Sequence, residues 1–66
     1  MPGLDVRTEL DTNVLTGETV VRIMYRRLPT RRFTRFVVVP DEGQTPAEII
    51  AHAEEAAILH DSRRRT

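Results

Sequence analysis

The side chains best suited to chemistry in this chain are its arginines, because all ten cationic side chains are arginine and lysine is absent. Six of them fall between residues 19 and 40, where there is no acidic residue, and alternate with aromatic side chains; they are Arg22, Arg26, Arg27, Arg31, Arg32 and Arg35, with Tyr25, Phe33 and Phe36 between and after them. A guanidinium is a planar donor that binds carboxylate or phosphate through two parallel hydrogen bonds. The segment therefore predicts a surface that recognises anionic groups.

A second basic group ends the chain, at Arg63, Arg64 and Arg65. Together with Arg27, Arg31 and Arg32 these arginines are the candidates for contacts with phosphate or with an acidic protein surface. Residues 63–66 are expected to form a basic tail after the helix, either as an arm that touches such a partner or as a frayed, solubilising end.

Catalytic and metal-binding patterns are missing from the sequence. His52 and His60 stand eight residues apart, whereas two histidines that grip one metal from a helix stand four apart. There is no cysteine. Pro2 could offer a proline amine as a base, as in the tautomerase family, but that family has a helix directly after its first strand and a loop is expected here. We therefore expect no catalytic residue, metal ligand, cofactor or small-molecule substrate.

The net charge of zero hides segregated charge. Residues 1–18 sum to −3, residues 19–40 to +6, residues 41–62 to −6 and the tail to +3. Opposite blocks of this kind suggest that copies of the chain could be partners for one another. The sequence pI near 6.7 weighs against nucleic acid, whose binding domains are usually basic overall.

Periodicity places these residues on three strands and a helix. Residues 4–10 alternate apolar and polar, residues 19–28 and 32–39 are rich in β-branched residues, and a loop at 11–17 and a break at Pro29–Thr30 separate them. Thr45, Pro46 and Glu48 form a capping box that starts a helix running to about residue 62. The predicted fold is α+β: a three-stranded antiparallel meander with one C-terminal helix packed on one face.

A turn at Pro29–Thr30 makes paired residues of the second and third strands sum to 59. One face then carries Val21, Ile23, Tyr25, Phe36 and Val38, and the helix offers Ile49, Ile50, Ala53, Ala56, Ala57 and His60 to it. The first strand could join with Val6 beside Ile23 and Leu10 beside Thr19. The opposite face carries the predicted partner-binding residues, which are Val20, Arg22, Met24, Arg26, Phe33, Arg35, Val37 and Val39.

The short length of the chain also suggests that the domain needs a partner for stability. Sixty-six residues allow one small domain, expected over residues 1–62, whose apolar burial barely offsets conformational entropy. Without cysteine no disulfide can add support. No membrane or targeting segment is evident, so a cytoplasmic protein is the default expectation.

The sequence thus predicts a non-catalytic interaction module that binds a protein, either itself or a larger partner, through the arginine and apolar sheet face. The alternative is sequence-specific DNA binding by the arginine hairpin in the major groove. The expected element order is similar to that of plant AP2 domains and of the arm-binding domains of tyrosine integrases, although their aromatic and glycine signatures are absent here. That likeness is one of topology alone.

Overall fold

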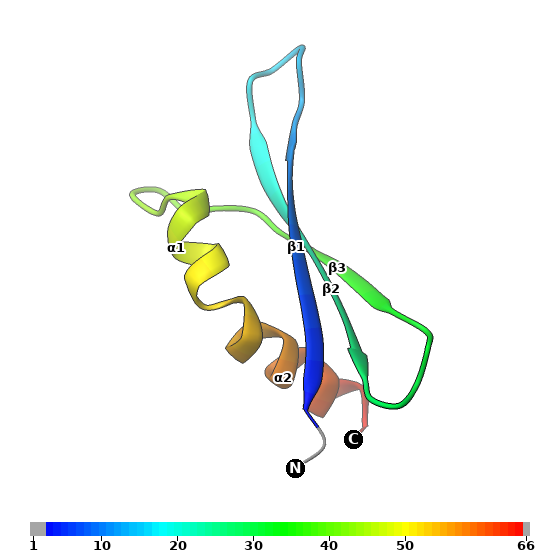
Figure 1. The fold of residues 1–66 in the computed structure, drawn as a ribbon. Helices are drawn as coiled ribbons and strands as arrows, with labels where there is room; N and C mark the ends of the chain where they lie inside the picture. The colour runs from blue at the N-terminus through cyan, green and yellow to red at the C-terminus, as the bar shows by residue number, and fades with distance from the viewer. Residues whose placement is uncertain (1–2, 66) are drawn as a thin grey trace.

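The computed structural model describes residues 3–65, so Pro2 and the last residue of the predicted tail, Thr66, lie outside the described residues. Three antiparallel strands form one sheet in the order β1-β2-β3: β1 spans Leu4–Thr12, β2 spans Thr19–Arg27 and β3 spans Thr34–Val38. Two helices follow, α1 at Pro46–Ala51 and α2 at Ala53–Arg64, and both lie on the same side of the sheet (Figure 1). The α+β meander predicted from the sequence is confirmed.

The pairing of β2 with β3 has the predicted register. Val21 lies opposite Val38, Ile23 opposite Phe36, and Tyr25 opposite Thr34. The ladder ends there, so the third strand is shorter than the predicted 32–39, and residues 28–33 form a connection rather than a tight two-residue tip. This connection contains a cis peptide bond between Leu28 and Pro29 and a hydrogen bond from the Thr30 amide to the Arg27 carbonyl at 2.8 Å.

The register predicted for β1 is wrong by two residues. Val6 lies opposite Tyr25 and Leu10 opposite Val21, instead of Ile23 and Thr19. A shift of two keeps every side chain on its predicted face. The observed pairing also places carboxylates opposite guanidiniums, for example Asp5 opposite Arg26, whereas the predicted one would have set two arginines against each other.

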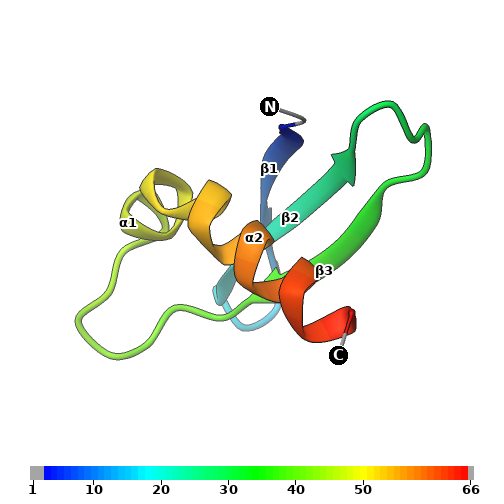
Figure 2. The same cartoon turned by 90° about the horizontal axis from the view of Figure 1, so that it is seen from below.

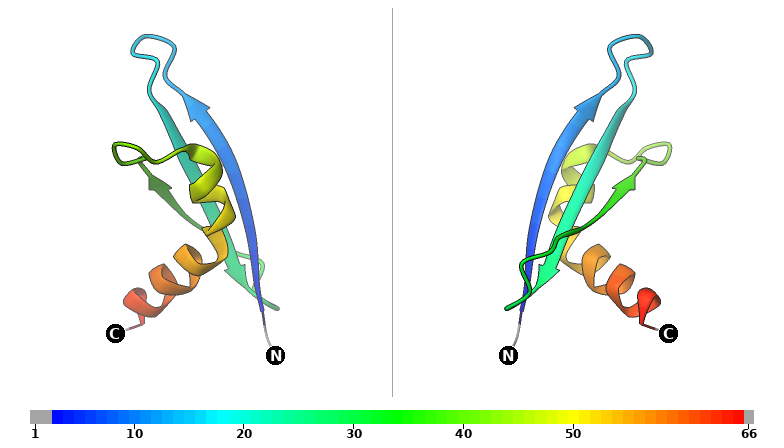
Figure 3. Two further views of the ribbon diagram at one scale, coloured as in Figure 1. Left: turned by 90° about the vertical axis from the view of Figure 1, so that its left-hand side faces the viewer. Right: turned by 90° about the vertical axis from the view of Figure 1, so that its right-hand side faces the viewer.

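A longer first strand accompanies this register. Thr12 pairs with Thr19, and their hydroxyl groups lie 3.0 Å apart. The loop shrinks to residues 13–18 and closes through a hydrogen bond from the Asn13 amide to the Glu18 carbonyl. Gly17 adopts a φ of +77° there, which a residue without a side chain tolerates best. The β1–β2 hairpin therefore projects well past the helices (Figure 3).

The helix begins as predicted but does not run unbroken. The Thr45 hydroxyl accepts the Glu48 amide at 3.3 Å, and Pro46 occupies the first turn. His52 then leaves helical geometry, with φ −110° and ψ 16°, and separates α1 from α2. The predicted single helix is corrected to two, and Ile50, which was predicted on the core face, is exposed. The second helix continues to Arg64, two residues beyond the predicted end.

The core lies between the helices and one sheet face. Its fully buried members come from β2, α1 and α2 and are Val21, Ile23, Tyr25, Ile49, Ala53 and Ala57. Val6, Phe36, Val38 and Ala56 pack around them, so the predicted apolar sheet face is confirmed. His60 also closes this face as predicted: its ring stacks on Phe36 at 4.4 Å, and its Nδ1 lies 2.8 Å from the Tyr25 hydroxyl.

The chain is long and thin for its size. Its extents are 39 × 21 × 21 Å, and its radius of gyration is 12.8 Å, against about 11 Å for a compact domain of this length. Viewed along the sheet, the helices form a layer on one side and leave the other side open (Figure 2). Among residues 3–65 there is no helix of the length and apolarity that a membrane crossing requires.

Candidate functional site: an arginine-bearing sheet face

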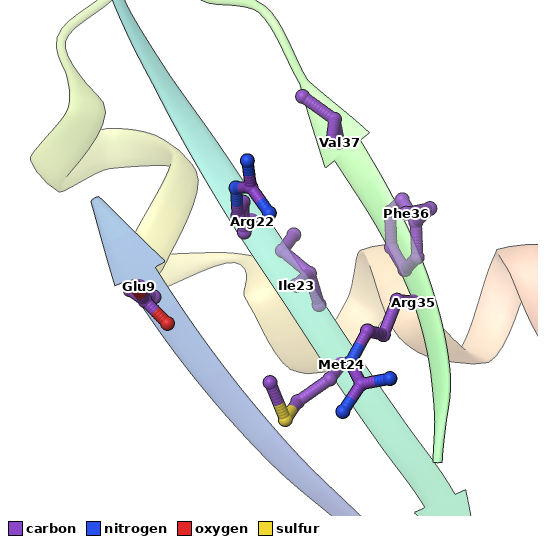
Figure 4. Close-up of a pocket in the computed structure, with 7 residues that line it drawn as sticks. All are labelled: Glu9, Arg22, Ile23, Met24, Arg35, Phe36 and Val37. Carbon is purple, nitrogen blue, oxygen red and sulfur yellow. The ribbon is translucent and has the colours of Figure 1, made fainter. Parts of the chain in front are cut away.

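The sheet face turned away from the helices, called here the outer face, collects six of the eight predicted partner-binding residues, whereas Phe33 and Val39 lie just outside β3. The register places Val20, Arg22, Met24 and Arg26 of β2 on it, beside Arg35 and Val37 of β3 and Asp5, Arg7, Glu9 and Asp11 of β1. Figure 4 looks onto this face, with the helices behind the sheet. Val37 is 54% exposed and Val39 is 65% exposed, so no part of residues 3–65 covers this edge of the face.

Two of the predicted binding arginines already have carboxylate partners within the chain. Arg22 donates to Asp11 through Nε at 3.0 Å and Nη2 at 2.7 Å. Arg26 donates through Nε to Asp5 at 2.9 Å, and both of those side chains are about three-quarters buried. These pairs join β1 to β2, so they position the strands before any partner arrives.

Phe33 is likewise engaged by the chain itself. The guanidinium carbons of Arg7 and Arg26 lie 5.1 and 5.0 Å from the centre of its ring. At these distances the ring attracts both cations. Phe33 therefore fixes two arginine side chains at the edge of the outer face instead of offering a free aromatic ring.

A shallow hollow of about 280 Å³ opens near the centre of the outer face. Its walls come from all three strands and are Glu9, Arg22, Ile23, Met24, Arg35, Phe36 and Val37 (Figure 4). Within residues 3–65, neither Glu9 nor Arg35 forms an ion pair or hydrogen bond through its side chain. The hollow thus holds an aliphatic floor between one carboxylate and one guanidinium that have no partner in this part of the chain.

The remaining predicted arginines gather elsewhere, at the end of the sheet where the β2–β3 connection meets the last turn of α2. There Arg27 forms an ion pair with Asp61, and Arg64 donates to the Thr34 hydroxyl at 2.7 Å. Arg32 and Arg65 line the same region. Arg31 is exposed nearby in sequence but is not part of that lining, and neither is Arg63 of α2.

Asp61 is the one acidic side chain in the lining of that region. The hydrogen bond from Arg27 lowers the pKa of its carboxyl group, and the charges of Arg27, Arg65 and Arg64 act in the same direction, while desolvation opposes them. The carboxylate therefore stays ionised beside the arginines. Arg63 and Arg64 of the predicted tail are part of α2, and the hydrogen bond from Arg64 to Thr34 holds this turn against β3.

Sequence reasoning missed the acidic residues of the outer face and of the region beside the last turn of α2. It assigned no role to Asp5, Glu9, Asp11 or Asp61, although the alternation of Asp5, Arg7 and Glu9 along one strand already placed them on one face. It also treated residues 11–17 only as a loop. The structure puts Val14 and Leu15 at the tip of the projecting hairpin, each 92% exposed.

No family model, curated protein or solved structure matches the chain. Within residues 3–65 no three histidine, cysteine or acidic side chains are grouped closely enough to hold a metal ion. The groups that the outer face does offer are guanidinium, carboxylate and aliphatic side chains, which suit non-covalent binding.

Proposed function

We propose that the chain is a non-catalytic interaction module that associates with a second copy of itself through the outer face. The observation that carries this proposal is the amount of exposed surface. The chain exposes 5297 Å², whereas a folded monomer of 7.6 kDa is expected to expose about 4300 Å². The excess of about 1000 Å² is similar to the roughly 800 Å² that each partner buries in a protein interface of standard size.

The outer face supports this assignment because apolar side chains lie on it between the charged ones. Val37 is exposed and Met24 is partly exposed on this face, with the helices on the opposite side of the sheet. Interfaces between identical chains are rich in such side chains and in arginine and methionine. Burial of this strip would add to a core in which six of the described residues are buried.

Charge gives the association its orientation. Glu9 and Arg35 lie on the two outer strands, on opposite sides of β2, and both are exposed. Two outer faces packed about a two-fold axis would bring Glu9 of each copy towards Arg35 of the other. Arg22 and Arg26, which the sequence placed among the partner-binding residues, are bound to Asp11 and Asp5 and take no part in this pairing.

A charge-swap experiment tests the proposal. Sedimentation velocity from 5 to 500 μM should show a dimer for the wild-type chain and monomers for Glu9→Arg and for Arg35→Glu, because each variant opposes two like charges across the interface. The double variant Glu9→Arg/Arg35→Glu should restore the dimer. Circular dichroism of all three variants verifies that the sheet remains folded.

A matched pair of apolar variants locates the interface. Val37→Asp should abolish association, whereas Ile58→Asp, at a residue of similar exposure on α2, should leave it unchanged. A wild-type chain that stays monomeric throughout the concentration range would overturn self-association. A double charge swap that stays monomeric while the wild type dimerises would overturn the Glu9–Arg35 pairing.

Base reading by the hairpin, the alternative predicted from the sequence, has less support than self-association, because within residues 3–65 Arg35 is the one predicted face arginine without a carboxylate partner. Bidentate recognition of guanine needs a free guanidinium. Arg22 and Arg26 would first have to leave Asp11 and Asp5, and the Asp5–Arg26 pair is partly buried.

A further inference from the structure

The largest concentration of arginine in the molecule surrounds an open hollow of about 540 Å³ beside the last turn of α2. We call it the hairpin–α2 hollow; its lining residues are Tyr25, Arg26, Arg27, Thr30, Arg32, Phe33, Thr34, Asp61, Arg64 and Arg65. Five arginines thus face one aspartate. They come from two segments that are about 30 residues apart in sequence, so the fold itself brings these charges together.

The internal contacts account for only part of this charge. Arg27 is neutralised by Asp61 and Arg26 by Asp5. Arg64 is held by the Thr34 hydroxyl, which carries no charge. Within residues 3–65, Arg32 and Arg65 form no ion pair at all.

The helix end does not explain the excess. The carbonyl end of a helix carries partial negative charge and favours nearby cations, which accounts for Arg63 and Arg64 in the last turn of α2. Arg32, however, comes from the β2–β3 connection, and the one carboxylate in the lining, Asp61, is already paired with Arg27. An anion bound between Arg32, Arg64 and Arg65 would stabilise this excess of positive charge.

We propose that the hairpin–α2 hollow is an oxyanion site that binds phosphate groups through Arg32, Arg64 and Arg65. The hydroxyl of Thr30, also in the lining, supplies a further donor. Such groups have two sources, the backbone of a nucleic-acid strand and a free diphosphate. A probe of each kind distinguishes them.

The aromatic contacts make this binding independent of base sequence. Base stacking needs an open ring face, and the Phe33 ring already faces the guanidiniums of Arg7 and Arg26. Tyr25 is buried, and its hydroxyl is hydrogen-bonded to His60. What remains accessible in the hollow is therefore guanidinium and hydroxyl, which bind phosphate and do not read bases.

Fluorescence anisotropy with a labelled 20-nucleotide single strand at 50 mM NaCl is the first arm of the test. Removing one phosphate contact to a single strand lowers the salt exponent by about 0.7, which corresponds to about eightfold weaker binding at this salt concentration. We expect that decrease for Arg32→Gln and again for Arg65→Gln. Both side chains are exposed and unpaired within the described chain, so the neutral variants should fold as the wild type does.

Arg31→Gln is the matched control, because it removes the same charge from an exposed residue of the same connection that is not part of the hollow's lining. It should change the affinity for the oligonucleotide by less than twofold. Two strands of unrelated base composition should bind with equal affinity.

The second arm measures the thermal midpoint with 5 mM sodium pyrophosphate against sodium chloride of equal ionic strength. Pyrophosphate should raise the midpoint of the wild type but not that of Arg32→Gln/Arg65→Gln. If only one of the two probes binds, the result supports the site and shows whether the phosphate groups that it binds belong to a nucleic-acid strand or to a free diphosphate. The proposal is overturned if neither probe binds, or if Arg31→Gln weakens binding as much as the hollow variants do.

Discussion

The contact between Tyr25 and His60 fastens the end of α2 to the centre of the sheet. The Tyr25 hydroxyl lies 2.8 Å from His60 Nδ1, and the Tyr25 ring meets the Phe36 ring edge-on at 6.1 Å. Tyr25 is 2% exposed, so replacement by phenylalanine removes one hydroxyl from a buried site and leaves the ring packing in place. We expect Tyr25→Phe to weaken the fold through this hydrogen bond alone.

The magnitude follows from the environment of the two groups. A neutral hydrogen bond contributes about 1 kcal/mol, and the loss approaches 2 kcal/mol where the remaining partner is kept from water. His60 is partly buried beneath the sheet, so about 1–2 kcal/mol is expected. For a chain of 66 residues, 1 kcal/mol lowers the thermal midpoint by roughly 7 °C.

A double-mutant cycle measured by urea unfolding isolates this hydrogen bond. His60→Phe keeps a ring stacked on Phe36, as the imidazole is at 4.4 Å and 7°, but removes the nitrogen. The loss of unfolding free energy in the double variant Tyr25→Phe/His60→Phe should therefore be about 1 kcal/mol smaller than the sum of the losses in the two single variants. Additivity within about 0.3 kcal/mol would refute the coupling of these side chains.

Two further perturbations test the ends of the helices. Asp61→Asn should be less stable than the wild type at pH 6, and this difference in stability should shrink on acidification. The pKa of Asp61 lies below its ordinary value of 3.8, so the stability that its carboxylate contributes is lost as pH falls through the folded-state pKa. Urea midpoints at pH 6 and pH 2.5 measure the difference, and a difference unchanged by pH would contradict the prediction. Thr45→Ala should cost about 1 kcal/mol in the same urea assay through loss of the N-cap hydrogen bond, whereas Thr45→Ser, which keeps the hydroxyl, should cost a few tenths.

The parts of the fold that sequence could predict are those set by local chemistry. Pro29–Thr30 and the alternation on either side fix the β2–β3 register, because a shift of one residue would expose Val21 and Ile23. Thr45 and Pro46 fix the start of the first helix, since threonine is a favourable N-cap residue and proline is favourable in the first turn. The apolar face and the opposite arginine-bearing face follow from these two features.

The parts that sequence could not predict depend on contacts between distant segments. The β1 register is decided by which arginine each aspartate meets, and both candidate registers place the same residues in the core. No proline or glycine at or beside His52 indicates in the sequence that the helix breaks there. It arises where one helix must follow a twisted sheet while keeping both Ile49 and Ala57 buried.

Pairing within the chain decides which charges remain for partners. Asp5, Asp11 and Asp61 each neutralise an arginine of β2. On the outer face Arg7 and Arg26 share Asp5, so Glu9 and Arg35 are its charged side chains without a partner in the described chain. This pair beside aliphatic side chains suits a second copy, and the association resists salt because apolar burial is not screened. The hairpin–α2 hollow is left with arginine alone, which suits phosphate and is sensitive to salt. The zero net charge therefore conceals two surfaces: association through the outer face should change little with salt concentration, whereas phosphate binding in the hairpin–α2 hollow should weaken as salt concentration rises. One series of salt concentrations can separate the two functions.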